Sequence, residues 1–270
     1  MTSTSGSTGP SQPVSRAAIV THGRVDVHTA EERVRDLASR EGVEVVDDPA
    51  ESELVVALGG DGTILRTFAR LLGTNVPVLG VNFGRVGFLA SIAPAGLEEG
   101  LARAFRGDFV VVELPTLEAH LNGETAVAVN DVVATSATLG RMVELSWAVG
   151  GEDLGVVPCD GMICCTPSGS TAYNLSNGGP VLVRGLDAMA ITFIAPHSLS
   201  ARPLVVPRGL ELTVRNTTPD VRAAVLVDGH RLAEIPPDGS LAIHLGPERS
   251  LLARMPEVTF FARYRETFAS

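Results

Sequence analysis

The sequence predicts two parts of different fold class: an α/β part with a parallel sheet, followed by a β-rich, antiparallel part. Three observations support this prediction. Apolar runs alternate with segments of helical spacing up to about residue 110, which is typical of βαβ units. Beyond residue 110, short β-rich runs separated by turn residues replace that alternation. A glycine-rich corner directly follows the apolar run 54–58, as at the carboxyl end of a parallel strand.

The first part contains four predicted strands and three predicted helices. Residues 30–40 have helical spacing, with Thr29 as the expected N-cap and Glu31 and Glu32 in the first turn. The predicted strands are 17–21, 43–46, 54–58 and 76–81, and the predicted helices are 30–40, about 64–72 and about 94–106.

The second part is predicted to be antiparallel, because turn pairs such as Asn122-Gly123 and Asp238-Gly239 separate its strands. One helix is expected to begin near Ser170 or Thr171, and the tail 258–268 is expected to pair back on either part. The predicted strands are 109–113, 117–121, 126–132, 142–149, 162–166, 190–194, 210–214, 223–227 and 240–245.

Length and charge limit the classes of function. The 270 residues fit one large or two ordinary domains, and a hydrophobic content of 45% supplies a core. The net charge of −10 argues against a nucleic-acid partner, which needs a basic face. The net charge does not exclude a nucleotide ligand, which needs only a local positive site.

The chain has no lysine, so all 21 basic residues are arginine. A Walker A phosphate loop ends in Gly-Lys-Ser/Thr and is therefore excluded. Schiff-base catalysis is excluded for the same reason.

The lack of a signal peptide and of a membrane helix predicts a cytoplasmic protein by default. Residues 1–14 are rich in Ser, Thr, Gly and Pro and lack the apolar stretch of a signal peptide, so we expect a disordered tail. No apolar run reaches the roughly 18 residues of a membrane helix, so no membrane partner is expected. Cys159, Cys164 and Cys165 have no histidine at zinc spacing and are expected to be buried free thiols.

The most informative motif is Gly59-Gly60-Asp61-Gly62-Thr63, which joins a predicted strand to a predicted helix. Glycines let the backbone approach a ligand closely, and amides at a helix start favour phosphate. A carboxylate there would repel phosphate unless it acts on a metal ion or a hydroxyl proton. The alternative interpretation is that this segment is only a turn, with no role in function.

Three further segments carry chemistry. Residues 80–89 form a second glycine-spaced loop after a strand, expected beside the Asp61 corner. Asn130-Asp131 is a polar pair within an apolar strand, where a carboxylate needs partners or a task, although a bulge or an Asx turn would also explain it. Residues 159–180 are rich in small hydroxyl residues and glycines, whose donors suit ribose, adenine and phosphate groups. The alternative is that this segment is only the start of a helix.

Taken together and in this order, these motifs resemble the NAD kinase family. The resemblance runs from about residue 17 to 262, and Thr166-Pro167-Ser168-Gly169-Ser170-Thr171-Ala172-Tyr173 is its most specific segment. The Gly-Gly-Asp-Gly-Thr turn is shared with lipid kinases and loosely with phosphofructokinases. The other matching segments are 82–89, Asn130-Asp131, Pro196-His197-Ser198-Leu199 and Asp228-Gly229-His230.

The resemblance implies a Rossmann-like domain over 15–110, completed by 250–270, and a β-sandwich-like NAD-binding domain over 111–249. It implies transfer of the ATP γ-phosphoryl group to the 2′-hydroxyl of the adenosine ribose of NAD, yielding NADP. Asp61 would be the catalytic base, and magnesium or another divalent cation would arrive with ATP. The family also suggests a homodimer or homotetramer.

The resemblance also assigns binding residues. Arg66 and Arg141 are candidates for phosphate contacts, with a solvated helix face and a loop charge as the alternatives. Asp160 would face adenine or be held by a neighbouring subunit, and His197 and His230 are equally well explained as structural histidines. ATP phosphates would contact Gly59, Gly60, Gly62 and Thr63. NAD would contact Asp61, Gly62, Arg66, Phe83, Asn130, Asp131, Arg141, Asp160, Ser168, Thr171, Ala172, Tyr173, Asn174, Leu175, Ser176, Ala195 and His230.

The sequence departs from the family at Pro158, where many members carry a basic residue. A phosphate or ribose contact made by that residue is then missing here or supplied from elsewhere. A lipid kinase of the diacylglycerol type and a non-catalytic NAD(P)-binding sensor are the alternative functions. Hydride transfer is disfavoured because the motif is not Gly-x-Gly-x-x-Gly. The donor (ATP or polyphosphate), the acceptor (NAD or NADH) and feedback regulation are left open.

Overall fold

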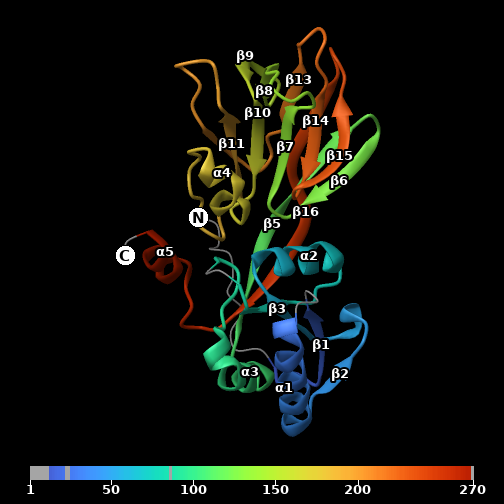
Figure 1. The fold of residues 1–270 in the computed structure, drawn as a ribbon, viewed down its shortest axis with the longest axis vertical. Helices are drawn as coiled ribbons and strands as arrows, with labels where there is room; N and C mark the ends of the chain where they lie inside the picture. The colour runs from blue at the N-terminus through green and yellow to red at the C-terminus, as the bar shows by residue number, and fades with distance from the viewer. Residues whose placement is uncertain (1–11, 22–24, 85–86, 269–270) are drawn as a thin grey trace. The chain divides into compact units, whose positions relative to one another are not determined.

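The computed structural model describes residues 12–21, 25–84 and 87–268. The chain divides into two compact units, with Met1–Leu114 and Arg249–Ser270 in unit 1 and Pro115–Glu248 in unit 2 (Figure 1). The boundary between the units falls within two long strands, β5 (Val110–Leu121) and β16 (Ser240–Arg254).

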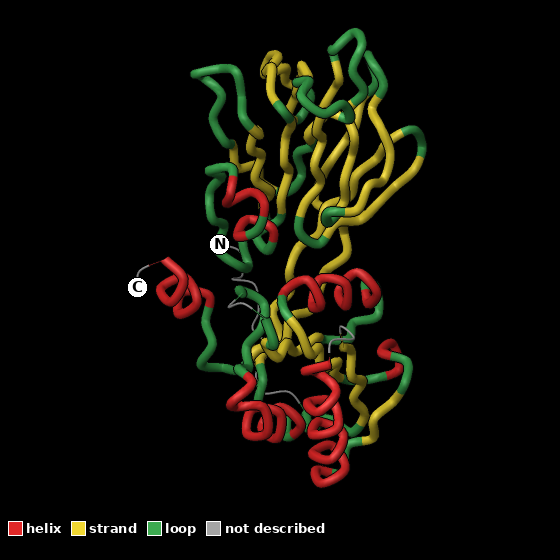
Figure 2. The backbone as a smooth tube through the Cα atoms, viewed as in Figure 1, coloured by secondary structure: helices red, strands yellow, loops and turns green. Residues whose placement is uncertain are grey.

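Unit 1 is an α/β unit built on a parallel sheet (Figure 2). Its strand order is β2-β1-β3-β4, and the end of β16 pairs parallel with β4. The elements are β1 (Arg16–Thr21), α1 (Val25–Glu41), β2 (Glu44–Val46), β3 (Leu54–Gly59), α2 (Asp61–Leu71), β4 (Val78–Asn82), α3 (Leu97–Phe105) and α5 (Phe260–Phe268), with 3₁₀ turns at Pro49–Glu51 and Pro94–Gly96.

The corner between β3 and α2 follows from local sequence. Leu54–Leu58 are fully buried, as a central parallel strand requires. Gly60 has an extended backbone and is the N-cap of α2, so the helix begins at Asp61. Ile64, Phe68 and Leu71 share the buried face of that helix, at the spacing of one helical stripe. Asp61 is thereby fixed at the carboxyl end of the sheet.

Unit 2 is antiparallel and places its core between two sheets. One sheet has the order β12-β11-β10-β7-β14-β15, and the other contains β16-β13-β8-β9 with β5 and β6. Trp147 packs edge-on against Phe193 inside this core, with ring centroids 5.4 Å apart. The remaining elements are β6 (Glu124–Ala128), β7 (Asp131–Ser136), β8 (Val143–Val149), β9 (Glu152–Cys159), β10 (Gly161–Cys165), α4 (Tyr173–Ser176), β11 (Ala188–Ile194), β12 (Leu204–Pro207), β13 (Leu212–Asn216), β14 (Ala223–Val227) and β15 (His230–Ile235), with a 3₁₀ turn at Gly169–Thr171.

The predicted fold class is confirmed, while several predicted boundaries are wrong. Helix α1 begins at Val25, so Thr29 lies inside it and is not its N-cap, because no glycine or proline interrupts residues 25–29. The two predicted strands 109–113 and 117–121 are one continuous strand, β5, which runs through Pro115. The tail forms helix α5 in unit 1, where Phe260 and Phe268 contact Phe88.

Three strands of unit 2 were not predicted: β9, β12 and β15. Each stands at the end of its sheet, with a neighbour on one side only. Most of β9 is exposed, so it lacks the alternation of apolar and polar residues that reveals a half-buried strand. Edge position therefore explains why the sequence pattern missed these strands.

The three cysteines are free and buried, as predicted. Burial raises the pKa of Cys159 and of Cys165 to about 12, so both thiols stay protonated at neutral pH. Among the described residues, none of the helices has the length and apolar character needed to cross a membrane.

Candidate functional site

The carboxylate of Asp61 is held by backbone amides from a loop that follows β4. Phe88 N donates to Oδ2 at 2.8 Å, and Leu89 N donates to Oδ1 at 3.2 Å. A carboxylate has about four acceptor positions, so each oxygen keeps one for a further donor. Asp61 is therefore oriented, and still able to accept a hydroxyl proton.

The close approach of the loop depends on Gly87. A Cβ atom built on Gly87 would collide with the Asp61 carboxylate, so any larger residue would displace it. The same loop is tied to the corner by Phe83 N, which donates to Gly59 O at 3.1 Å. The prediction that this loop lies beside the Asp61 corner is confirmed, although Arg85 and Val86 of the motif lie outside the described residues.

The first turn of α2 combines amides with a cation. Arg66 is exposed, and its Nη1 lies 4.0 Å from the position that a Cβ on Gly62 would take. The guanidinium thus folds back over the N-terminal turn of the helix. Thr63 N already donates to Gly60 O at 2.9 Å, so a phosphate would have to use amides that precede Thr63.

In unit 2, Asp228 organises the Asn130-Asp131 pair. Its carboxylate accepts hydrogen bonds from the amides of Val129, Asn130 and Asp131 at 2.8, 2.7 and 3.1 Å. These bonds separate β6 from β7, so the predicted single strand 126–132 is wrong. Asp228 and Gly229 both have positive φ and form the two-residue turn of the β14–β15 hairpin.

Asp131 is a buried carboxyl group, with only 6% of its surface exposed. Burial, and secondarily the negative charge of Asp228, raise the pKa of Asp131 to about 7. A titratable carboxyl group near neutral pH on a strand end is a recognised feature of functional sites.

The segment after β10 is fastened to the Asn130 backbone. Thr166 N donates to Asn130 O at 2.9 Å, and Thr166 Oγ1 donates to Val129 O at 2.7 Å. Two buried side-chain oxygens here, Asn130 Oδ1 and Ser168 Oγ, have no hydrogen-bond partner among the described residues. Buried polar atoms are nearly always paired, so these two mark where a ligand could bind.

Asn174 anchors the following turn. Its Nδ2 donates to Ser170 O and Pro180 O at 3.1 and 3.0 Å, and its Oδ1 accepts from Thr192 Oγ1 at 2.7 Å. The side chain is fully buried and engaged within the protein. Around it, Tyr173 is exposed, and the other predicted members of this segment are also at least partly accessible: Thr171, Ala172, Leu175 and Ser176.

The structure places Asp160 and Ala195 away from Asp131, and His230 near it. Strand β10 pairs Cys165 with Asp131 at one end and Gly161 with Thr135 at the other. Asp160 N donates to Ile194 O, so exposed Asp160 and Ala195 lie near the end opposite to Asp131. His230 starts β15 opposite Val227, near the Asp131 end, and is exposed.

Arg141 is explained by an ion pair. Its Nη2 donates to Asp220 Oδ2 at 2.8 Å, and both side chains are more than half exposed. This agrees with the interpretation of Arg141 as a loop charge.

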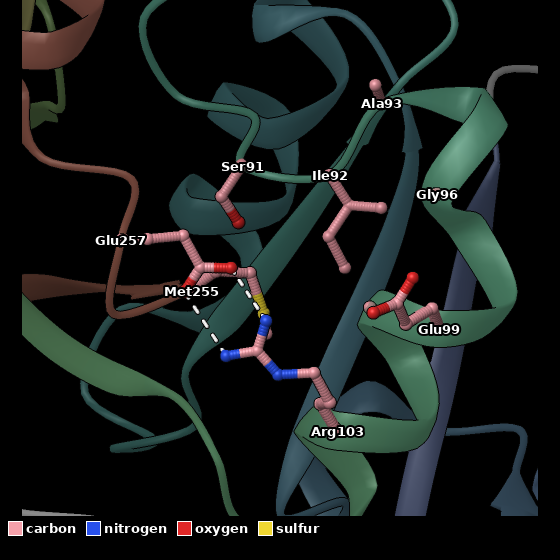
Figure 3. Close-up of a pocket in the computed structure, with 9 residues that line it drawn as sticks. Ser91, Ile92, Ala93, Gly96, Glu99, Arg103, Met255 and Glu257 are labelled. Carbon is pink, nitrogen blue, oxygen red and sulfur yellow. Dashed lines mark hydrogen bonds and ion pairs between the residues drawn. The ribbon is translucent and has the colours of Figure 1, made fainter.

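Unit 1 contains a pocket of about 200 Å³ (Figure 3). Its lining includes Ser91, Glu99 and Arg103, and none of the predicted site residues. Arg103 pairs with Glu257 across it at 2.7 Å and also with Asp108 at 2.6 Å, so its charge is already compensated.

Two contributions to the candidate site were missed from the sequence. The amides of Phe88 and Leu89 carry no side-chain signal, so only the fold reveals them. Asp228 was noted only within a motif, although an Asp-Gly pair between two apolar runs predicts a hairpin turn.

Comparison with known proteins identifies the family. Residues 18–109 match the family model of the ATP-NAD kinase N-terminal domain, and residues 129–255 match that of the C-terminal domain. The NAD kinase of Gemmatimonas aurantiaca is 38% identical over 241 residues, which cover 87% of this chain and 83% of that protein. This chain belongs to the NAD kinase family.

Other NAD kinases extend the match. That of Methanopyrus kandleri is 34% identical over 91% of this chain and 95% of its own length. The NAD kinase of Archaeoglobus fulgidus, solved in complex with ATP, has a TM-score of 0.79 at 27% identity, covering 93% of this chain and 98% of its own. Yeast NADH kinase complexed with NADH shares the fold, with a TM-score of 0.82 at 21% identity over 96% of this chain and 88% of its own.

The raised pKa of Asp131 predicts a pH-dependent stability. Because its folded pKa of about 7 exceeds the ordinary value of 3.8, the native chain loses stability as pH rises between these values. Replacing the group (Asp131→Asn) removes that loss. The variant should gain up to about 4 kcal/mol relative to the native chain between pH 4 and pH 8.

Denaturant unfolding followed by Trp147 fluorescence measures the stability of both chains at each pH. Trp147 is the one tryptophan and lies in the unit 2 core. Glu152→Gln, at an exposed position on β9, is the matched control and should change stability by less than about 0.5 kcal/mol. A difference between Asp131→Asn and native that is equal at pH 4 and pH 8 would contradict the assigned pKa.

Proposed function

We propose that this chain transfers the γ-phosphoryl group of ATP to the 2′-hydroxyl of the adenosine ribose of NAD, producing NADP and ADP. Membership of the NAD kinase family supports ATP-dependent phosphorylation of NAD. The oriented carboxylate of Asp61 at the start of α2 is the structural observation that supports it most strongly. The comparisons give no support to the lipid-kinase alternative.

Asp61 acts as the general base. The ribose 2′-oxygen forms a bond to the γ-phosphorus while the bond from that phosphorus to the β–γ bridging oxygen breaks and ADP leaves. The hydroxyl proton passes to a carboxylate oxygen of Asp61 and then to solvent. Phosphoryl transfer depends mainly on positioning and charge neutralisation, so a weak base suffices.

The first turn of α2 supplies positive potential for the phosphates. Amides before Thr63 and the guanidinium of Arg66 are the groups placed for this, in a chain that has no lysine. A Cβ on Gly60 would meet no atom within 4 Å, so this glycine leaves room for a phosphate to approach the backbone, whereas the space beside Gly59 is filled by the side chain of Thr63. The interpretation of Arg66 as a phosphate ligand is favoured over a solvated helix face because its guanidinium covers this turn.

A divalent cation, expected to be magnesium, would neutralise phosphate charge when it arrives with ATP. Asp61 is the carboxylate at the corner, and its two oxygens each keep a free acceptor position beside the amide donors. Oxygen donors of this kind suit magnesium, so the residues present fit such an ion.

The dinucleotide would bind unit 2 through the polar atoms around β7. Asn130 Oδ1 and Ser168 Oγ are buried and have no hydrogen-bond partner within the described part of the chain, and a carboxylate at Asp131 accepts ribose hydroxyls. Tyr173 is exposed beside the same segment and offers a ring for stacking. Asn174 would act by holding the segment, and Phe83, Thr171, Ala172, Leu175, Ser176 and His230 are the remaining proposed contacts.

Asp160 and Ala195 lie toward the far end of β10, so we assign them to the site of a neighbouring subunit in a homodimer or homotetramer. Ala195 has φ of +42°, an unusual backbone for a residue with a side chain and a feature of binding segments. The cytoplasmic location and the choice between ATP and polyphosphate stay predictions for experiment.

Replacing the base (Asp61→Asn) should reduce NADP formation from NAD and ATP by roughly 10²–10⁴-fold, because the amide side chain cannot accept the proton. The assay measures NADP with magnesium present, and Asp36→Asn on the exposed face of α1 is the matched control. Equal rates for native and Asp61→Asn would remove Asp61 as the base. NAD binding without NADP formation by the native chain would favour the non-catalytic sensor.

Enlarging the glycine under the carboxylate (Gly87→Ala) should lower the turnover number by roughly 10²-fold, because the added Cβ displaces Asp61. Gly96→Ala is the control, since a Cβ there meets no atom within 4 Å. Thermal unfolding monitored by circular dichroism checks that both variants fold. Full activity in a folded Gly87→Ala variant would show that the observed position of Asp61 is not needed.

A further inference from the structure

A cluster of two histidines and a glutamate lies on the sheet of unit 2 that contains β5 and β16. Glu118 and His120 are two residues apart on β5 and so share one face of it, and His244 comes from β16, which pairs with β5 (Figure 1). Thr116 Oγ1 donates to Glu248 O at 2.9 Å, and the rings of His120 and His244 stack at 5.1 Å. The two strands therefore run antiparallel here, and their side chains meet across them.

The ligand atoms of this cluster have metal-binding distances. Glu118 Oε2 lies 3.6 Å from His120 Nε2 and 3.4 Å from His244 Nε2. All three atoms lie within 4.8 Å of one another. Tetrahedral zinc with bonds of about 2.0–2.1 Å separates its ligand atoms by about 3.3–3.4 Å, close to the two separations from Glu118. The two imidazole rings stack in this structure, so binding requires them to turn until both Nε2 atoms face the ion.

Neighbouring residues orient two of the three ligands. His120 Nδ1 lies 2.9 Å from Thr125 Oγ1, a contact that fixes the ring and leaves Nε2 available to a metal. A Cβ on Gly246 would come within 2.9 Å of Glu118 Cγ, so glycine there makes room for the glutamate. His244 Nδ1 is buried and has no hydrogen-bond partner among the residues that the structure describes, and that ring stacks on His120.

The position of the cluster separates it from the nucleotide-binding residues of unit 2. Asp131 begins β7, Asn130 directly precedes it, and Ser168 follows β10, and both strands belong to one sheet. Glu118 and His244 belong to the other sheet of this unit. The side chains of Glu118, His120 and His244 are 20%, 39% and 34% exposed, so an ion can reach them from solvent.

We propose that Glu118, His120 and His244 form a zinc-binding site, with solvent completing the coordination. Imidazole nitrogen and a single carboxylate suit zinc, whereas magnesium prefers oxygen ligands and an octahedral shell. The site is therefore chemically separate from the magnesium that accompanies ATP. Bound zinc links β5 to β16 by side chains and stabilises unit 2.

The first experiment titrates the chelator-treated full-length chain with zinc sulfate alone and measures binding by calorimetry. One zinc ion per chain is expected at this site. His244→Gln and Glu118→Gln should each weaken binding by more than about 100-fold, since each removes a direct ligand, whereas Thr125→Val should weaken it by roughly 10–100-fold. His28→Gln, an exposed histidine on α1, is the matched control and should bind as the native chain does.

Zinc bound equally by native and cluster variants would overturn the proposal, as would absence of zinc binding by the native chain. The buried, protonated thiols of Cys159 and Cys165 are unsuited to compete for the ion. A tenfold excess of magnesium should leave zinc binding unchanged, and displacement of zinc by magnesium would contradict a site built on imidazole.

A second readout does not depend on calorimetry. Zinc should raise the unfolding temperature followed by Trp147 fluorescence in the native chain and leave it unchanged in His244→Gln and Glu118→Gln. Cobalt in place of zinc should give the intense visible absorption of a tetrahedral site in the native chain only. Equal stabilisation of native and variants by zinc would contradict the cluster as its binding site.

Discussion

The hydrogen bonds from Phe88 and Leu89 to Asp61 are the interaction on which the candidate catalytic centre depends. They join the corner between β3 and α2 to the loop after β4, two segments that share the carboxyl edge of the parallel sheet. Without them a carboxylate at a helix start would be free to rotate away from a substrate. Gly87 makes the contact possible by leaving the space that the carboxylate occupies.

Unit 2 uses a similar device for a different purpose. Asp228, at a hairpin turn, accepts hydrogen bonds from three consecutive backbone amides, and these bonds separate β6 from β7. Asn130 and Asp131 are thereby presented at a strand end, next to the Thr166–Ser170 segment. In both units a carboxylate bound to backbone amides shapes a polar site beside a strand end, and chain segments distant in sequence are brought together.

Local signals in the sequence predict the buried elements and the motifs of the candidate site. Strand β3, helix α2 and the glycine corner follow from an apolar run, glycine and helical spacing, which are all short-range features. Edge strands such as β9 and β15 bury one side only and give weak patterns. The amide contacts to Asp61 and the separation of Asp160 from Asp131 depend on strand pairing over long distances, which one sequence does not encode locally.

The role of Asp61 as the base is tested by the distance between its carboxylate and the ribose of bound NAD. A crystal structure of the native chain with NAD and a non-hydrolysable ATP analogue measures it. If Asp61 is the base, the adenosine 2′-hydroxyl oxygen lies within about 2.6–3.2 Å of an Asp61 carboxylate oxygen, with Phe88 and Leu89 still donating to that carboxylate. A 2′-hydroxyl that contacts another group, with Asp61 remote from the ribose, would contradict this role.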